Sequence, residues 1–205
     1  PILEVEAPIM QAQFAETLTI NALHYAMTVA SKAARCRIAA PDAAVVDFGL
    51  RRTPGIEAGL TAARSCYLVG FEATSNLLAG EQYEIPVSGT VAHSFIEACP
   101  SEIEAFRAFR DTFPGPVTLL IDTYDTIRGA HHAVQVAREI EADGRRVAAV
   151  RLDSGDLVDL SRNVRRILDD AGLTDVRIIA SGGLDEYELQ RFTKENVPID
   201  GYGVG

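Results

Sequence analysis

Short apolar runs that end in charged, hydroxyl or glycine residues recur along this chain. The runs with their polar ends are 45–51, 86–93, 117–125, 147–156, 176–183 and 199–205. They are rich in Val, Ile and Leu, and from Val87 onward they recur about every thirty residues, as βαβ units do. Because the carboxyl ends of barrel strands carry the site in such folds, the pattern predicts a parallel α/β barrel and an enzyme.

Apolar residues at helical spacing fill the intervals between these runs. Helices are predicted at about 11–35, at 55–70, around 74–79, from 101 to 114, from 122 to 144, from 157 to 172 and from 185 onward. In the first, Phe14, Leu18, Ala22, Tyr25 and Val29 form the repeating row. Local signals support the ends of the others. Ser101 with Glu104 forms a capping box, Asp185 with Glu188 forms a second, and Gly144 and Gly172 suit helix ends.

Composition narrows the possible functions. The chain has 205 residues, 47% of them hydrophobic, which is enough for a full core. Its formal net charge is −10 and its only lysines are Lys32 and Lys194, so a broad basic face for nucleic acid is not expected. An anionic substrate would need local arginines and backbone amides.

The cysteines predict the cellular compartment of the protein, and the two chain ends indicate whether the sequence is a whole protein. Cys36, Cys66 and Cys99 form no C-x-x-C pair, so neither a disulfide framework nor a zinc site is expected, and a reducing cytoplasm is the prediction. No apolar run reaches membrane-spanning length and no signal peptide is visible. The chain opens on Pro1 without methionine and stops at Gly205 within a glycine-rich run, so we expect the middle of a longer protein.

Paired carboxylates stand at two strand-to-helix turns. Asp125 and Asp156, the second members, suit either an N-cap or a site. Asp122 and Asp153, the first members, stand at the strand ends, where a carboxylate can hold Mg²⁺, bind ribose hydroxyls or stabilise a developing positive charge. We therefore predict functional roles for Asp122 and Asp153.

Glycine-rich segments close the last two strands. The residues concerned are Ser181, Gly182, Gly183, Gly203 and Gly205. Late glycine loops of phosphate-binding barrels bind phosphate through backbone amides, although glycines also serve tight turns. Two such segments in succession predict a 5′-phosphate site.

His93, Arg51 and Arg151 are the other candidates. His93 follows a predicted strand end, which favours a role over simple hydrogen bonding. Arg51 and Arg151 flank acidic strand ends, where a guanidinium suits carboxylate or phosphate. His24, His131 and His132 fall inside amphipathic helices and are expected to be packing or solvated residues.

Six motifs together resemble the nicotinate phosphoribosyltransferase family. They lie at 47–52, 70–76, 86–94, 121–126, 151–156 and 180–185, in the family's order and over nearly the whole chain. The resemblance implies a type II phosphoribosyltransferase barrel, incomplete here, with residues 1–8 the remnant of an N-terminal sandwich domain and 9–205 the catalytic domain without its C-terminal part. It implies transfer from phosphoribosyl pyrophosphate to nicotinate in NAD salvage, giving nicotinate mononucleotide and pyrophosphate, with ATP hydrolysis coupled.

The resemblance also implies residue roles and partners. Phe48 would stack on the pyridine ring, with Arg51 beside it, and Arg151 would contact the nicotinate carboxylate. Thr74 and Ser75 occupy the loop where nicotinamide-using relatives have an aspartate, and His93 matches the histidine that ATP phosphorylates. Asp122 and Asp153 match the carboxylates near the ribose and Mg²⁺, and the glycines above match the 5′-phosphate loops. The family's homodimer shares its active site, one aromatic residue coming from the partner subunit.

Alternatives remain open at this point. Nicotinamide or quinolinate phosphoribosyltransferases are the nearest, although Thr74-Ser75 speaks against nicotinamide and a second carboxylate would need more cations. A phosphate-binding aldolase or isomerase would need a Schiff-base lysine or a strand-end glutamate, and both lysines fall in predicted helices. A barrel segment kept as a non-catalytic interaction module is the last alternative.

Overall fold

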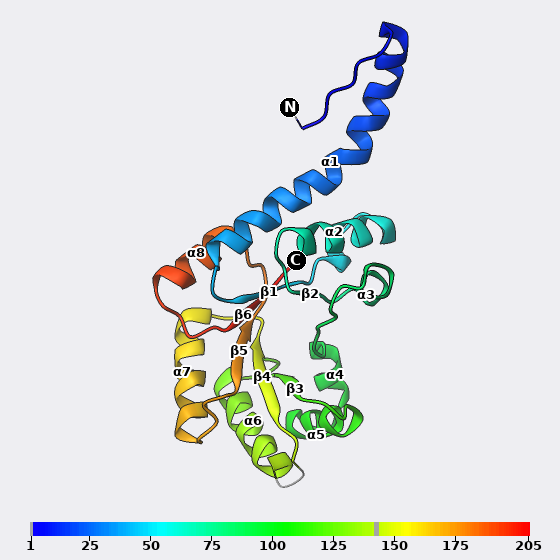
Figure 1. Ribbon diagram of the computed structural model, residues 1–205. Helices are drawn as coiled ribbons and strands as arrows, with labels where there is room; N and C mark the ends of the chain where they lie inside the picture. The colour runs from blue at the N-terminus through cyan, green and yellow to red at the C-terminus, as the bar shows by residue number, and fades with distance from the viewer. Residues whose placement is uncertain (1, 142–143) are drawn as a thin grey trace.

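A six-stranded parallel sheet forms the centre of the computed structural model, which describes residues 2–141 and 144–205 (Figure 1). The strands are β1 (Ala44–Asp47), β2 (Ala73–Thr74), β3 (Val117–Leu120), β4 (Val147–Leu152), β5 (Arg177–Ala180) and β6 (Gly201–Val204). Their order is β2-β1-β6-β5-β4-β3, and every neighbouring pair is parallel. The predicted α/β class and partial barrel are confirmed.

The expected strand at 86–90 is reduced to one bridge. Val87 pairs with Thr74 of β2, and its neighbours form no further ladder. The reason lies in the partner, because β2 is two residues long and offers no edge for a longer strand. Pro86 also lacks the N–H that a ladder needs. The segment still lies beside β2 and carries the chain toward His93.

Helices form near each of the predicted positions, with shifts of a few residues at their ends. They are α1 (Ile9–Ala39), α2 (Ile56–Leu68), α3 (Leu77–Tyr83), α4 (His93–Ala98), α5 (Glu102–Thr112), α6 (Thr126–Glu141), α7 (Leu157–Asp170) and α8 (Glu186–Lys194), with a 3₁₀ turn η1 at Leu50–Arg52. Of these, the structure adds α4 and η1, which were not predicted. The predicted helix caps and helix-ending glycines are observed. Ser101 and Asp185 cap α5 and α8, and Gly144 and Gly172 adopt the positive φ of helix-ending glycines.

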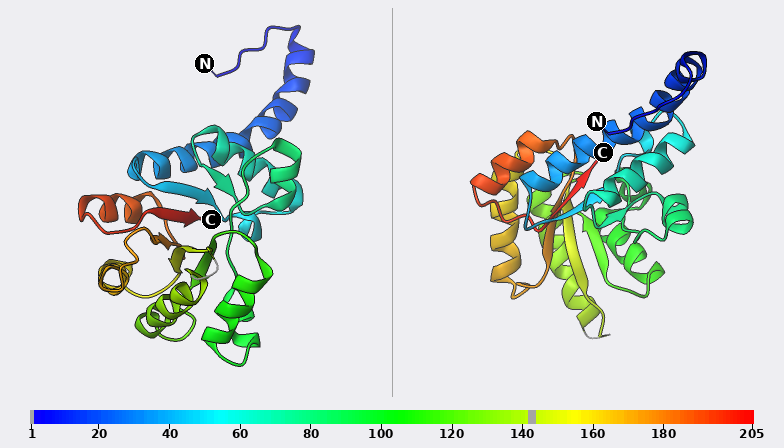
Figure 2. Two further views of the ribbon diagram at one scale, coloured as in Figure 1. Left: turned by 60° about the horizontal axis from the view of Figure 1, so that its bottom comes forward. Right: turned by 45° about the horizontal axis from the view of Figure 1, so that its top comes forward.

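Helix α1 has two different halves. Its C-terminal half packs on α2 and α8, where Ala33 and Cys36 are buried. Its N-terminal half extends away from the body of the protein (Figures 1 and 2). Phe14 and Leu18, at 79% and 62% exposure, therefore lie on the predicted helix without packing into the core. Residues 2–8 form neither helix nor strand, and their proposed origin in a sandwich domain stays a prediction.

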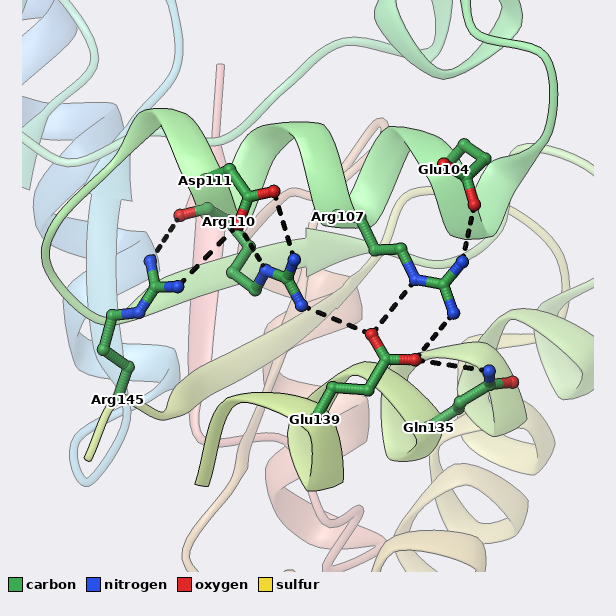
Figure 3. Close-up of polar contacts among 7 residues, drawn as sticks. All are labelled: Glu104, Arg107, Arg110, Asp111, Gln135, Glu139 and Arg145. Atoms are coloured by element: carbon green, nitrogen blue, oxygen red, sulfur yellow. Dashed lines mark hydrogen bonds and ion pairs between the residues drawn. The ribbon is translucent and has the colours of Figure 1, made fainter. Parts of the chain in front are cut away.

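Two polar clusters join α5 to α6. On the surface, Glu139 of α6 accepts hydrogen bonds from Arg107 and Arg110 of α5 (Figure 3). Nearer the core, His132 lies 2.8 Å from Glu102 through Nδ1 and Oε2, so it makes a specific contact beyond simple packing. Burial raises the pKa of Glu102, with His132 opposing that rise. Both clusters fix α5, which follows the short helix carrying His93.

The cysteines are unpaired, and the thiol of Cys66 has a strongly shifted pKa. Cys36, Cys66 and Cys99 are free thiols. Burial raises the pKa of Cys66 to about 12, with nearby Asp47 adding to the rise, so this thiol is neutral at physiological pH. Within 2–141 and 144–205, none of the helices combines the length and apolar character needed to cross a membrane.

Candidate active site

A groove of about 1050 Å³ lies along the inner side of the curved sheet. Its wall comes from both ends of the strand order, with Leu77 and Val87 beside β2, and Val117 and Thr118 in β3. The carboxyl ends of the strands supply its polar rim. The predicted site residues that line it are Phe48, Arg51, Ser75, His93, Arg151 and Asp153.

Phe48 has a tightly defined place in this groove. It follows β1, and its amide donates to the carbonyl of Val204 in β6 at 2.7 Å. A Cβ on Gly203 would lie 2.6 Å from its ring, so only glycine permits this approach. The guanidinium carbon of Arg151 lies 5.3 Å from the ring centroid, within cation–π range. An aromatic ring and a cation therefore adjoin in the groove.

Arg151 is held by a set of hydrogen bonds. Nε donates to Ser181 Oγ at 2.6 Å, Nη1 to Thr90 Oγ1 at 2.7 Å, and Nη2 to Asp153 Oδ1 at 2.8 Å. A planar guanidinium bound through all three nitrogens has one orientation. The carboxylate of Asp153 offsets much of the charge of Arg151. Arg51 on η1, by contrast, forms no ion pair within the described chain.

His93 and Asp153 meet at the rim. His93 Nε2 lies 3.5 Å from Asp153 Oδ2, and its Nδ1 lies 3.1 Å from Thr123 Oγ1. Burial opposes ionisation of Asp153, but hydrogen bonds from Ser181 and Arg151 outweigh it and bring its pKa below the ordinary value. A charged Asp153 favours the imidazole tautomer with its proton on Nε2, leaving Nδ1 as the acceptor.

Asp122 lies behind Asp153. Its Oδ2 accepts from the Asp153 amide at 2.8 Å and from Ser154 Oγ at 2.6 Å. Its Oδ1 is buried and has no hydrogen-bond partner among the described residues. The second members of the two Asp pairs act as caps, since Asp125 accepts from the Arg128 amide and Asp156 from the Val158 amide. Asp122 therefore supports the turn that carries Asp153, while its second oxygen stays without a hydrogen-bond partner among the described residues.

Two adjacent hydroxyl residues have different surroundings. Ser75 lines the groove, and its amide donates to the carbonyl of Asp47 at 2.8 Å. Thr74 is fully buried, and its hydroxyl donates to Asp47 Oδ2 at 2.7 Å. Of the two, Ser75 is placed to face a ligand.

The predicted phosphate-binding glycines differ in how closely other atoms approach them. Gly182 has φ +90°, and a Cβ there would lie 2.0 Å from the carbonyl oxygen of Asp153. Gly183 has φ +65° and open space where a side chain would be. A Cβ on Gly205 would lie 2.8 Å from the carbonyl of Phe48, so Gly203 and Gly205 are also explained by close approach to β1. The Ser181 hydroxyl is bound to Asp153 and Arg151.

Two carboxylates, Asp122 and Asp153, are the residues that could hold a magnesium ion. In the part of the chain that the structure describes, no three acidic, His or Cys side chains group as metal ligands. Mg²⁺ often uses only one or two protein carboxylates, with water and substrate phosphates completing its shell. The unpartnered Oδ1 of Asp122 and the rim carboxylate of Asp153 meet that lower requirement.

Comparison with known proteins assigns most of the chain to one family. Residues 43–197 match the profile described as the nicotinate phosphoribosyltransferase (NAPRTase) family. The chain belongs to this family. Among NAPRTase relatives, "Nicotinate phosphoribosyltransferase pncB2" of Mycobacterium tuberculosis is 49% identical over 207 residues, covering 100% of this chain and 44% of that protein. "Nicotinate phosphoribosyltransferase" of Bacillus subtilis is 42% identical over 206 residues, covering 100% and 42%.

Solved structures agree with the NAPRTase assignment. Human nicotinic acid phosphoribosyltransferase superposes with a TM-score of 0.87 at 31% identity, over 97% of this chain and 51% of that one. Nicotinate-nucleotide pyrophosphorylase from Pyrococcus furiosus gives 0.77 at 27%, over 88% and 46%. The chain thus spans about half the length of these relatives.

Four polar residues of this NAPRTase site were not predicted individually. Thr123 contacts His93, Thr90 binds Arg151, Ser154 binds Asp122, and Asp47 binds Thr74. All four fall inside the six motifs, and that membership is the signal that could have found them. Sequence spacing alone does not show that residues 61 positions apart, such as Thr90 and Arg151, share a hydrogen bond.

Proposed function

We propose that the intact protein transfers a phosphoribosyl group from phosphoribosyl pyrophosphate to nicotinate, giving nicotinate mononucleotide and pyrophosphate. One arrangement carries the proposal: the Phe48 ring lies beside Arg151, and Ser75, His93 and Asp153 line the same groove. The family assignment and the activity named for its relatives support it.

The base site suits an aromatic carboxylate. Phe48 offers a face for stacking, and Arg151 lies beside that ring with one N–H of Nη2 still available after its bond to Asp153. Arg51, whose charge no ion pair offsets in the described residues, adds a cation at the groove. Ser75 is uncharged, so it does not repel a carboxylate as an aspartate would. These contacts favour nicotinate over nicotinamide.

Transfer at the anomeric carbon needs stabilisation of positive charge. The sugar passes through an oxocarbenium-like state as pyrophosphate leaves, and a fixed carboxylate lowers the energy of that state. Asp153 is held ionised at the rim by Ser181 and Arg151 and is the residue we assign to this task. Gly182 and Gly183 follow β5 and would receive the 5′-phosphate through backbone amides.

Three further elements belong to the same proposal. Asp122 and Asp153 would hold Mg²⁺, which neutralises the leaving pyrophosphate. His93 would accept a phosphoryl group from ATP, since its ring is oriented by Thr123 and Asp153 at the groove. A second copy of the protein would complete the base site in a homodimer.

Substrate competition tests the proposal. The intact protein is incubated with phosphoribosyl pyrophosphate and either nicotinate or nicotinamide, and kcat/KM is measured for each base. We expect nicotinate to be preferred by about a hundredfold or more, because a mismatched charge or hydrogen bond in a closed site costs that much. Ser75→Asp should shift the preference toward nicotinamide. Equal kcat/KM values for the two bases would refute the assignment, and turnover of quinolinate alone would favour the related enzyme class.

A further inference from the structure

Asp47 is a buried carboxylate that lies just outside the groove. It is the last residue of β1 and is 3% exposed. It does not line the groove, and it borders instead a separate cavity of about 310 Å³ beneath α1, together with Tyr25 and Cys66. A ligand in the groove therefore does not touch Asp47, and any effect it has on that ligand passes through its neighbours.

Each oxygen of this carboxylate binds a different segment of the groove wall. Oδ1 accepts from the Gly49 amide at 2.9 Å, directly after Phe48. Oδ2 accepts from the Thr74 hydroxyl at 2.7 Å, directly before Ser75. The Asp47 carbonyl adds a third bond, from the Ser75 amide at 2.8 Å. One side chain thus ties together the two segments that carry the aromatic platform and the groove hydroxyl.

The connection continues into the helix that follows. Thr74 Oγ1 accepts from the Asn76 amide at 3.0 Å, and Asn76 Oδ1 caps α3 through the Ala79 amide at 3.1 Å. Thr74 is fully buried and Asn76 is nearly so. Thr74 can do this because its hydroxyl donates in one direction and accepts in another. The loop 74–76 is therefore held from Asp47 outward.

We propose that Asp47 is a positioning residue that sets the spacing between Phe48 and Ser75, and with it the fit of the base. This inference rests on the proposed nicotinate site. Both partners of the carboxylate donate in the wild-type protein. An asparagine of the same shape has only one acceptor oxygen, so its amide nitrogen would either face the Gly49 N–H or force the Thr74 hydroxyl to change from donor to acceptor. Small displacements of positioning groups have large effects on binding and rate.

Matched variants of the intact protein test this role. Asp47→Asn and Thr74→Val should each raise the KM for nicotinate about tenfold. The KM for phosphoribosyl pyrophosphate should stay within about twofold, because the phosphate loops belong to β5 and β6. Thr74→Ser keeps the hydroxyl and should lose far less than Thr74→Val. Asp42→Asn makes the same chemical change on an exposed carboxylate ahead of β1 and serves as the control.

Hydrogen exchange gives a second readout that does not need turnover. Amides of 48–49 and 74–76 should exchange faster in Asp47→Asn and remain unchanged in Asp42→Asn. The positioning role would be overturned if exchange at 48–49 and 74–76 were unchanged in Asp47→Asn. It would also be overturned if the KM values for nicotinate and phosphoribosyl pyrophosphate both rose together with a general loss of thermal stability. If wild-type protein does not use nicotinate, the proposed function fails, and the exchange data alone then decide whether Asp47 links the two segments.

Discussion

His93 and Asp153 face each other across the rim of the groove, with 3.5 Å between Nε2 and Oδ2. They come from different elements, since His93 is the first residue of α4 and Asp153 follows β4. Asp153 also binds Arg151, which lies over Phe48. The proposed phosphoryl acceptor, the rim carboxylate and the base platform are therefore joined by consecutive contacts, and a change at one of them should be felt at the others.

Asp153→Asn should lower kcat/KM by about a hundredfold, because it removes the charge assigned to the oxocarbenium-like state. It should also cost stability. The pKa of Asp153 is below its ordinary value in the folded protein, so the folded state binds fewer protons than the unfolded state near that pKa. The stabilisation is complete above the unfolded pKa of about 3.9 and is lost as the pH falls through the folded pKa.

Thermal unfolding from pH 8 to pH 3 checks this sign. The difference in Tm between wild type and Asp153→Asn should be constant down to about pH 5 and should shrink below about pH 4. A difference that grows on acidification would contradict the ion pair with Arg151.

His93→Ala should abolish ATP hydrolysis and the stimulation of transfer by ATP, and should leave slow ATP-independent transfer measurable. The reason is that the variant lacks the imidazole that would accept the phosphoryl group, so the charge and acceptor oxygens that a phosphohistidine adds to the rim would be missing. The assay uses γ-labelled ATP and looks for acid-labile, base-stable label on the peptide that contains His93. Label on another peptide, or full ATP stimulation in the variant, would show that His93 only binds substrate.

Gly182→Ala should destabilise the protein and weaken binding of phosphoribosyl pyrophosphate. The new Cβ would meet the Asp153 carbonyl at 2.0 Å in a backbone with φ +90°, so the turn after β5 must move. Gly172→Ala is the control, since Gly172 has φ +80° and open space around the added methyl. The control should lose about 1 kcal/mol from backbone strain alone. Equal losses in the two variants would show that the approach to Asp153 is not limiting.

Glu139→Gln should lower Tm by a few degrees at most, and by less in high salt, because its ion pairs with Arg107 and Arg110 lie near the surface (Figure 3). Hydrogen bonds from Arg107 hold the pKa of Glu139 below its ordinary value, so the effect should fade on acidification. Glu188→Gln removes an exposed pair with Arg191 within α8 and should change Tm less. A loss of activity without a loss of Tm would point to a role for α5 in the site.

The features predicted most accurately from the sequence are those that depend on residues close together in the chain. Strand β4 lies within the predicted run 147–156, and the caps at Ser101 and Asp185 form as expected, because each depends on side chains within a few positions. Asp156, for which a cap and a site were both open, acts as a cap. The single bridge at Val87 was overestimated as a strand, because its length depends on a partner segment. Asp47 falls in the predicted run 45–51, yet its bond to Thr74 spans 27 positions and could not be read from spacing.

Burial along α1 could not be predicted for a related reason. Periodicity places Phe14 and Leu18 on one helix with Val29, but whether a face packs depends on what lies opposite. Asp122 shows the same limit within the site. Its position at a strand end indicated catalysis, and the structure adds a supporting role through the Asp153 amide and Ser154. Its substitution should therefore affect stability as well as rate.

The place of β6 has a consequence for biosynthesis. β6 comes last among the six strands in sequence, yet it lies between β1 and β5 in the sheet. Until it is made, the nascent chain holds two separate pieces, β2-β1 and β5-β4-β3, each with a bare edge. The pairing of β1 with β6 joins residues 157 positions apart (Ala44 with Gly201), and contacts of such long range form slowly. During synthesis these two edges must therefore stay free of wrong partners until β6 emerges and joins them.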